Sequence, residues 1–159
     1  MKKLALALLI LTLALTATAL YLRLGAQLNV IGAGFSEKSA ANEIDAWVNL
    51  YIELTDGTFQ GTVLNDAEMD DASGYVFRTY SVNLRNLGML RAEWISMAVH
   101  PQPADIIAYG ESRGFTLPAF SYGTISATLL ARAGSSTART VSVEYYVFGR
   151  KFTIDVIAE

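Results

Sequence analysis

A run of carboxylates is the first feature of the sequence that could bind a ligand. The run comprises Asp66, Glu68, Asp70 and Asp71. Carboxylate oxygens that alternate along a loop are hard ligands of the kind that calcium prefers. The EF-hand pattern is not met, because Asp71 stands where that loop needs glycine and Phe77 stands where it needs glutamate. Two interpretations therefore stay open, a weak calcium loop and a solvated acidic loop without any cofactor.

Residues 110–114 match the G-x-S-x-G pattern of a hydrolase nucleophile elbow, with Ser112 as the nucleophile. That turn must lead from a strand into a helix, but residues 115–118 end in proline and cannot continue as a helix. The only histidine, His100, precedes the serine, whereas the α/β-hydrolase order places the histidine after it. The sequence therefore disfavours an envelope hydrolase, and we predict no catalytic residue.

Three aromatic residues are candidates for a partner-binding surface. Tyr146 and Phe148 fall on the polar side of an alternating strand, where they belong either to an exposed patch or to a second buried face. Depending on which face of the predicted 91–99 strand points inward, Trp94 is either a core residue or an exposed aromatic beside Ile95 and Met97. We carry Trp94, Tyr146 and Phe148 forward as a possible partner surface.

The composition excludes several kinds of chemistry. The absence of cysteine rules out a lipoprotein lipobox, disulfides, thiolate metal sites and thiol catalysis. Beyond residue 24, nine basic and fifteen acidic residues give a formal charge of −6, so phosphate backbones are repelled and we expect no nucleic-acid partner. Nine of these carboxylates fall between residues 37 and 71, where Lys38 is the only basic residue.

The first 24 residues predict a membrane anchor. Residues 4–22 carry no charge and form a helix of about 28 Å, which matches the hydrocarbon core of a bilayer. Lys2 and Lys3 precede this run and Arg23 follows it, so the positive-inside rule predicts a single-pass protein with a cytoplasmic N-terminus and an extracytoplasmic C-terminal domain. The alternative is a secreted protein cleaved after Ala19, because residues 17–19 fit a signal peptidase site.

Elements that would position these residues are mostly strands. Residues 25–45 are rich in glycine, alanine and serine, which predicts an irregular stalk or linker before a domain at 46–159. Alternation predicts a strand at 47–54, followed by a hairpin turn at Asp56 and Gly57. Further strands are predicted at 75–85, 91–99, 105–109 and 123–131, separated by glycine and proline.

The last two strands form the clearest predicted hairpin. Apolar residues alternate from Val141 to Val147, and a turn at Gly149 and Arg150 leads into a second alternating run. This turn would place Val147 opposite Phe152 and Tyr145 opposite Ile154. Seven or eight short strands without a second helical pattern predict an all-β antiparallel sandwich of the immunoglobulin-like kind, preceded by one N-terminal transmembrane helix.

A family resemblance rests on short motifs. The N-x-G turn at 86–88 and the Leu117-Pro118 pair before the 123–131 strand resemble the immunoglobulin-like domains of the CARDB and type 2 late-embryogenesis-abundant kinds. This resemblance covers about residues 46–157 and implies a binding or spacer module without a named ligand.

The expected function is therefore non-enzymatic. We expect a module of a prokaryotic cell envelope that serves binding, adhesion or assembly of a larger complex. Its partners would be the bilayer, through residues 4–22, and another envelope protein or a second copy of the chain. The alternative is an accessory or anchoring subunit of a surface filament, such as a pilus or archaellum, or of a secretion apparatus.

Overall fold

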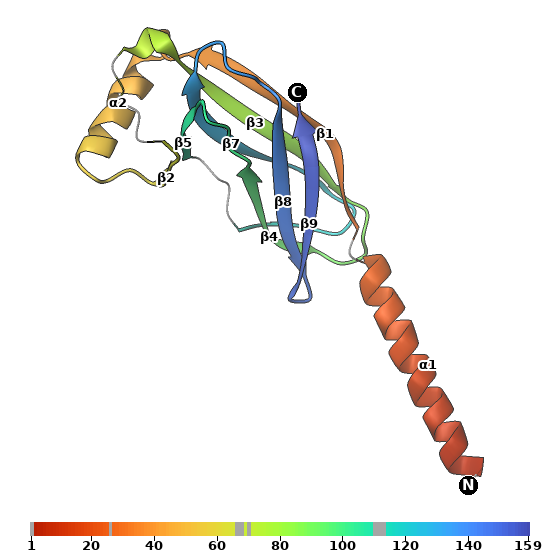
Figure 1. Cartoon of the computed structure of the whole chain (residues 1–159). Helices are drawn as coiled ribbons and strands as arrows, with labels where there is room; N and C mark the ends of the chain where they lie inside the picture. The colour runs from red at the N-terminus through yellow and green to blue at the C-terminus, as the bar shows by residue number, and fades with distance from the viewer. Residues whose placement is uncertain (1, 26, 66–68, 70, 110–113) are drawn as a thin grey trace.

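The computed structural model describes residues 2–25, 27–65, 69, 71–109 and 114–159, and it consists of a long N-terminal helix joined to a β-sandwich (Figure 1). In chain order the elements are α1 (Lys2–Gly25), β1 (Leu28–Ser39), α2 (Ile44–Thr55), β2 (Gly61–Val63), the 3-10 turn η1 (Ala72–Gly74), β3 (Tyr75–Asn86), β4 (Ala92–Val99), β5 (Asp105–Tyr109), β6 (Phe115–Leu117), β7 (Tyr122–Arg132), β8 (Arg139–Val147) and β9 (Arg150–Ala158).

Two antiparallel sheets make up the sandwich. One has the strand order β1-β3-β7-β5-β2 and the other has the order β6-β4-β8-β9. Without the short edge strands β2 and β6, these orders are the ABED and CFG sheets of a constant-type immunoglobulin sandwich. The predicted fold class is therefore confirmed, with nine strands in place of seven or eight.

The main core lies between the two sheets, where alternate side chains of facing strands meet. Its fully buried members include Val82 and Leu84 of β3, Ile125 and Leu129 of β7, Ile95 and Met97 of β4, and Val141 and Val143 of β8. Burying such a side chain stabilises the fold by about 1.5 to 3 kcal/mol relative to leaving it in water. The period-two alternation of the long strands thus specifies which face of each sheet points inward.

Buried arginines close one end of this core. Arg139 donates from Nη2 to Oδ1 of Asp105 at 2.7 Å and from Nε to Oδ2 at 2.9 Å. Arg78 donates from Nε to Oε2 of Glu37 at 2.6 Å and from both terminal nitrogens to the loop at Ser135 and Ser136. Arg139 also donates from Nη1 to the carbonyl of Ser136 at 2.6 Å, so the two arginines tie the β7-β8 loop to both sheets. Each charge needs such partners in a low-dielectric interior.

A second, smaller cluster holds α2 on the outer face of the five-stranded sheet. Trp47 and Leu50 of α2 are buried against side chains from β3, β5 and β7. The Trp47 and Tyr75 rings lie 5.0 Å apart between centroids. Residues 47–54, predicted as a strand, therefore form a helix instead. Most residues in this run are apolar, so the run fits the alternation of a strand and also fits a helix, in which Trp47, Leu50 and Leu54 share one side with i, i+3, i+7 spacing.

Gly57 also has a different role from the one predicted. Its φ of +68° follows the last turn of α2, where a glycine commonly ends a helix. The expected hairpin at Asp56 and Gly57 is absent from the described chain, and β2 pairs with β5 instead.

The stalk predicted at residues 25–45 is wrong as well. Residues 28–39 form β1, which pairs with β3 from Leu28 opposite Asn86 to Ser39 opposite Val76. Main-chain hydrogen bonds hold an edge strand whatever its side chains are, so a run rich in glycine, alanine and serine gave no periodic signal. Only residues 26 and 27 separate α1 from β1.

The final hairpin has the predicted faces but another turn. Phe148 and Gly149 occupy the turn with φ of 50° and 73°, as a type I′ turn requires at both central positions. Val147 therefore pairs with Arg150, and Tyr145 pairs with Phe152 in place of Ile154. The register differs from the prediction by two residues, which leaves the same side chains of β9 pointing inward.

Candidate functional site

The acidic loop is described only in part. Asp66, Glu68 and Asp70 lie outside the described residues. The Asp71 carboxylate accepts hydrogen bonds from the backbone N–H and the hydroxyl of Ser73, at 3.1 and 2.6 Å, which lower the pKa of Asp71. In the part of the loop that the structure describes, Asp71 thus opens the turn η1. Calcium binding by the whole loop stays a prediction.

The G-x-S-x-G motif also falls mostly outside the described chain. Ser112 is not described, but the residues directly after Gly114 form the strand β6. A nucleophile elbow requires a helix at this point, whose N-terminus helps to stabilise the oxyanion. The backbone that follows the motif is therefore unlike the elbow of an α/β-hydrolase.

A histidine, a serine and an aspartate meet on the outer face of the four-stranded sheet. Ser142 Oγ lies 2.7 Å from His100 Nε2 and donates to Asp155 Oδ1 at 2.6 Å. In a catalytic triad the carboxylate holds the imidazole, which in turn takes the proton of the serine. Here the Asp155 carboxylate accepts a hydrogen bond from the serine hydroxyl and not from the imidazole, so this exposed group lacks the connectivity of a triad. Sequence reasoning missed it because His100 directly follows β4, whereas Ser142 and Asp155 lie in β8 and β9.

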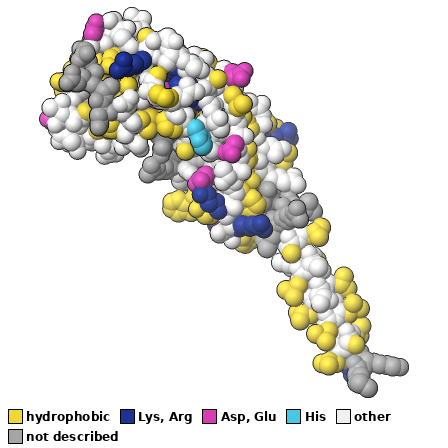
Figure 2. Space-filling model, in the orientation of Figure 1, with side chains coloured by type: hydrophobic (Ala, Val, Ile, Leu, Met, Phe, Trp, Pro, Cys, Tyr) yellow, Lys and Arg dark blue, Asp and Glu magenta, His cyan; other side chains and the backbone are white. Residues whose placement is uncertain are grey.

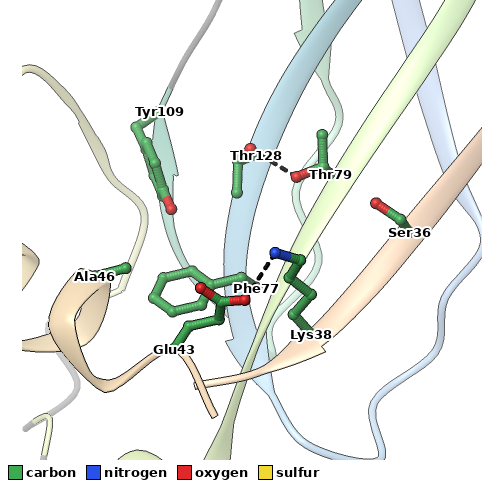
Figure 3. A pocket seen from close by; sticks show the side chains of 8 residues that line it. All are labelled: Ser36, Lys38, Glu43, Ala46, Phe77, Thr79, Tyr109 and Thr128. Carbon is green, nitrogen blue, oxygen red and sulfur yellow. Dashed lines mark hydrogen bonds and ion pairs between the residues drawn. The ribbon is translucent and has the colours of Figure 1, made fainter. Parts of the chain in front are cut away.

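A small recess lies where the start of α2 meets the outer face of the five-stranded sheet (Figure 3). Its volume is about 190 Å³, and Ser36, Lys38, Glu43, Ala46, Phe77, Thr79, Tyr109 and Thr128 line it. Lys38 Nζ pairs with Glu43 Oε1 at 2.7 Å, and the hydroxyls of Thr79 and Thr128 bond each other at 2.9 Å. Ligand clefts usually enclose about 300 to 1,000 Å³. The recess is smaller than this, and its two charged side chains, Lys38 and Glu43, neutralise each other.

Tyr109 at the edge of this recess belongs to a set of shielded phenols. Burial raises the pKa of Tyr109 above its ordinary value of 10.0, and the negative charge of Glu53 raises it further. Burial likewise raises the pKa of Tyr80 and of Tyr145. Each un-ionised phenol therefore favours folding, an advantage that is complete below pH 10 and is lost as the pH rises through the folded-state pKa.

We expect the melting temperature to fall steeply above pH 10 and to fall less steeply in Tyr109→Phe, because phenylalanine cannot ionise. Circular dichroism melts at a series of alkaline pH values measure this difference, and Tyr51→Phe on the exposed side of α2 is the matched control. If the melting temperature fell equally steeply with pH in Tyr109→Phe and in wild type, the shielding of Tyr109 would be contradicted.

The outer side of α2 presents an apolar stripe. Ile44, Val48, Tyr51 and Ile52 are all about half exposed. Their spacing of i, i+4, i+7 and i+8 places them along one side of the helix, away from the buried Trp47 and Leu50. Asp45 directly follows Ile44 and Glu53 directly follows Ile52, and both add negative charge. This stripe was not predicted, because it depends on the segment being helical.

The predicted partner residues Trp94, Tyr146 and Phe148 come together at the end of the sandwich where α1 joins. Trp94 and Tyr146 line one shallow recess of about 480 Å³, and Phe148 lines a neighbouring one of about 460 Å³. Glu93 belongs to both recesses. Trp94 is 68% exposed, so the core position allowed for it is wrong.

Other exposed apolar residues at the same end were not predicted. Together with Trp94 and Phe148, we call Met89, Phe120 and Tyr122 the aromatic rim; all five are more than 60% exposed. Figure 2 shows hydrophobic and basic side chains close together near the base of the helix. The turns at residues 86–88 and 118–121 were visible in the sequence, but their meeting at one end follows only from the strand pairing.

The N-terminal helix has the features of a membrane span. Residues Lys3–Tyr21 have a mean hydropathy of 2.2, and no part of this stretch is buried against the sandwich. Hydrophobic side chains cover its surface along the length shown in Figure 2. A signal sequence has the same composition, so the helix is a possible anchor by length and apolarity.

Comparison with known proteins gives a distant likeness among solved structures. No protein-family model matches the chain, and no curated protein matches it. Among solved structures, the FixG-related protein from Vibrio parahaemolyticus is similar with a TM-score of 0.39 and 16% identity, over 79% of this chain and 91% of that one. A likeness at this level carries no functional argument, and the sandwich is defined by the strand pairing of the chain itself.

Proposed function

We propose that the protein is a non-enzymatic, single-pass module of the cell envelope that binds another envelope protein through the apolar stripe of α2. In this proposal the N-terminus is cytoplasmic and α1 is retained as the anchor, so that the sandwich stands outside the cytoplasm. The stripe of Ile44, Val48, Tyr51 and Ile52 is the observation that carries the proposal.

Packing within the chain does not explain this stripe. The inner side of α2 already uses Trp47 and Leu50 to attach the helix to the sheet. A surface helix normally turns polar residues to water, and a second apolar side is typical of helices that lie in the groove of a partner. Because Asp45, Glu53 and Asp56 flank the stripe, we expect the rim of that groove to be basic.

Distance from α1 favours a protein over lipid as the occupant. Trp47 packs on Tyr75 at the start of β3, whereas β3 ends at Asn86 beside the start of β1. Twelve residues of strand extend about 40 Å. The stripe is thus held far from a bilayer that contains α1, within reach of another protein that projects from the membrane.

The lack of catalytic connectivity among the described residues supports a binding role. The His100, Ser142 and Asp155 group has the wrong order for a triad. Among the described residues, no three His, Cys, Asp or Glu side chains gather as a metal site would require. The recess beside α2 is small, and its charged groups are paired.

Photo-cross-linking in intact cells tests this proposal. A photoreactive amino acid at Val48 or Ile52 is expected to give a discrete adduct with a second protein, and adding Tyr51→Asp to the same chain should abolish the adduct. Thr140, exposed on the opposite sheet, is the control position and should give none. An adduct whose mass equals two copies of this chain, or equal labelling from Val48 and Thr140, would contradict the proposed partner.

The membrane topology has its own measurement. Retention of α1 predicts that the full-length chain is extracted only with detergent and that protease added outside spheroplasts degrades the sandwich. A soluble form that begins at Leu20 would show cleavage instead and would overturn the anchor.

A further inference from the structure

Three aromatic residues of the rim combine exposure with a strained backbone. Within the described chain, the non-glycine residues with positive φ are Trp94, Phe120 and Phe148, with φ of 53°, 57° and 50°. Their side chains are 68%, 66% and 71% exposed. The left-handed conformation costs about 1 to 2 kcal/mol for a residue with a side chain, and glycine would adopt it freely. The backbone conformation at these positions favours glycine, and the exposed side chains do not pack in the core of the sandwich. Folding therefore does not require a large aromatic side chain there.

All three residues lie at the end of the sandwich that α1 enters. Leu28, the first residue of β1, pairs with Asn86, and the backbone of Leu87 donates to the carbonyl of Gln27 at 2.8 Å. The start of β7 lies alongside, because Tyr122 pairs with Arg85. Glu93 at the start of β4 pairs with Tyr146 next to the β8-β9 turn. The rim therefore lies at the same end of the sandwich as the point where the chain leaves α1 (Figure 1).

The connection to α1 keeps this end of the sandwich within about 16 Å of the hydrocarbon core when α1 spans a membrane. The apolar stretch ends at Tyr21, the helix ends at Gly25, and β1 begins at Leu28. Four helical residues rise about 6 Å, and three further steps of extended chain add at most about 10 Å. The headgroup layer on each side of a bilayer is roughly 5 to 8 Å thick. The rim can therefore reach this layer when α1 spans the membrane.

Charge at this end suits an anionic lipid surface. The described basic residues here are Arg85, Arg91, Arg150 and Lys151, and the acidic ones are Glu93 and Glu144. Glu93 pairs with Arg91, and Glu144 pairs with Lys151 at 2.6 Å. Arg85 and Arg150 instead lie over the rings of Tyr122 and Phe152, at 5.1 and 5.4 Å. The end near α1 is thus basic, whereas the described part of residues 37–71 holds six carboxylates and one lysine.

We propose that the aromatic rim inserts into the headgroup layer of the membrane that α1 anchors, with Arg85 and Arg150 facing lipid phosphates. This inference rests on the proposed anchoring of α1. Tryptophan and other aromatic side chains favour the interface between hydrocarbon and water, and arginine binds phosphate through several hydrogen bonds. Two turns and the irregular stretch of β4 carry these aromatic side chains and fix the sandwich on the bilayer, so the stripe of α2 is held at a set height above it.

Tryptophan fluorescence of the full-length chain in vesicles tests the insertion. The chain has two tryptophans, Trp94 in the rim and Trp47 in the buried attachment of α2, which packs on Tyr75 at the opposite end of β3. The difference between wild type and Trp94→Phe isolates the emission of Trp94, and the emission that remains in Trp94→Phe reports Trp47. This comparison leaves the buried tryptophan untouched, and Trp94→Phe removes an exposed side chain that the fold does not need.

In vesicles of phosphatidylglycerol brominated near the headgroup end of the acyl chains, we expect Trp94 emission to fall about twofold relative to unbrominated vesicles, since interfacial side chains reach this depth. Trp47 emission should not change. The double variant Phe120→Ser, Phe148→Ser should restore most of the Trp94 emission. Vesicles of phosphatidylcholine should give weaker quenching, because the basic side chains then lack an anionic surface.

The outcomes separate the two proposals. Failure of the chain to float with vesicles would overturn the anchor itself. Flotation with Trp94 quenched no more than Trp47 would overturn the insertion of the rim and leave the anchor intact. A blue shift of Trp94 emission that grows with the protein-to-lipid ratio, without quenching by brominated lipid, would assign the rim to contact with a second copy of the chain. Equal quenching in neutral and anionic vesicles would overturn the role given to Arg85 and Arg150.

Discussion

Replacing Asp105 by alanine is expected to lower the free energy of unfolding by about 3 to 5 kcal/mol, because it leaves the Arg139 guanidinium buried without a counter-charge. The Asp105 and Arg139 side chains are both fully buried and share two hydrogen bonds. Asp105 Oδ2 also accepts from the backbone N–H of Gln102 at 2.7 Å, so the substitution removes the partner of that group as well. Chemical denaturation followed by circular dichroism measures the loss.

An exposed ion pair provides the control. Lys38, whose side chain is 67% exposed, pairs with Glu43, and Lys38→Ala should change the free energy of unfolding by less than about 1 kcal/mol. The double variant Asp105→Leu, Arg139→Met should be far more stable than Asp105→Ala, since no buried charge is then left alone. If Asp105→Ala cost no more than Lys38→Ala, the pair would not be buried as described.

Strands with strict alternation were predictable from the sequence. The segment predicted at 105–109 coincides with β5, and those at 75–85, 91–99 and 123–131 match β3, β4 and β7 to within one residue at each end. Over most of β3, β4 and β7 one side faces the core and selects apolar residues, which is the signal that alternation measures, whereas β5 is a short apolar run bounded by Pro103 and Gly110. The buried Arg78 and Arg139 gave no such signal, because sequence alone does not bring their partners together.

The helix α2 and the strand β1 show where alternation fails. In residues 47–54 both sides of the helix are apolar, so a strand and a helix were equally compatible with the pattern. In β1 the side chains are small, and main-chain pairing with β3 decides the structure. Both errors also hid functional candidates, because the stripe exists only on a helix and the short link to α1 exists only if β1 starts at Leu28.

The candidate partner residues were predicted singly and were brought together by the fold. Trp94 lies where the pairing of β4 shifts register, so its side chain leaves the alternation of its neighbours. Phe148 is the first central residue of the β8-β9 turn, whereas the sequence pattern predicted Gly149 and Arg150 at the two central positions. Phe120 and Tyr122 were missed, because a loop residue has no periodicity that would reveal its direction.

Replacing Trp47 by alanine is expected to detach α2 from the sheet and to cost about 3 to 5 kcal/mol at that contact. The helix has 12 residues, and Glu43 at its start makes no side-chain capping bond. Isolated helices shorter than about 12 to 15 residues are marginal in water, so the packing of Trp47 and Leu50 must hold α2 in place. Hydrogen exchange of the α2 amides measures the detachment, and they should exchange far faster in Trp47→Ala than in wild type.

Tyr51→Ala on the stripe is the matched control for this detachment. Tyr51 is 52% exposed, and its loss should change stability by no more than about 0.5 kcal/mol and leave the α2 amides protected. The main core lies on the other side of the sheet and does not depend on α2. Once α2 has detached in Trp47→Ala, the free energy of unfolding of the sandwich should therefore fall by less than the cost at the Trp47 contact. Faster exchange in Tyr51→Ala than in Trp47→Ala would reverse the two sides of the helix, and the stripe would then be its attachment to the sheet.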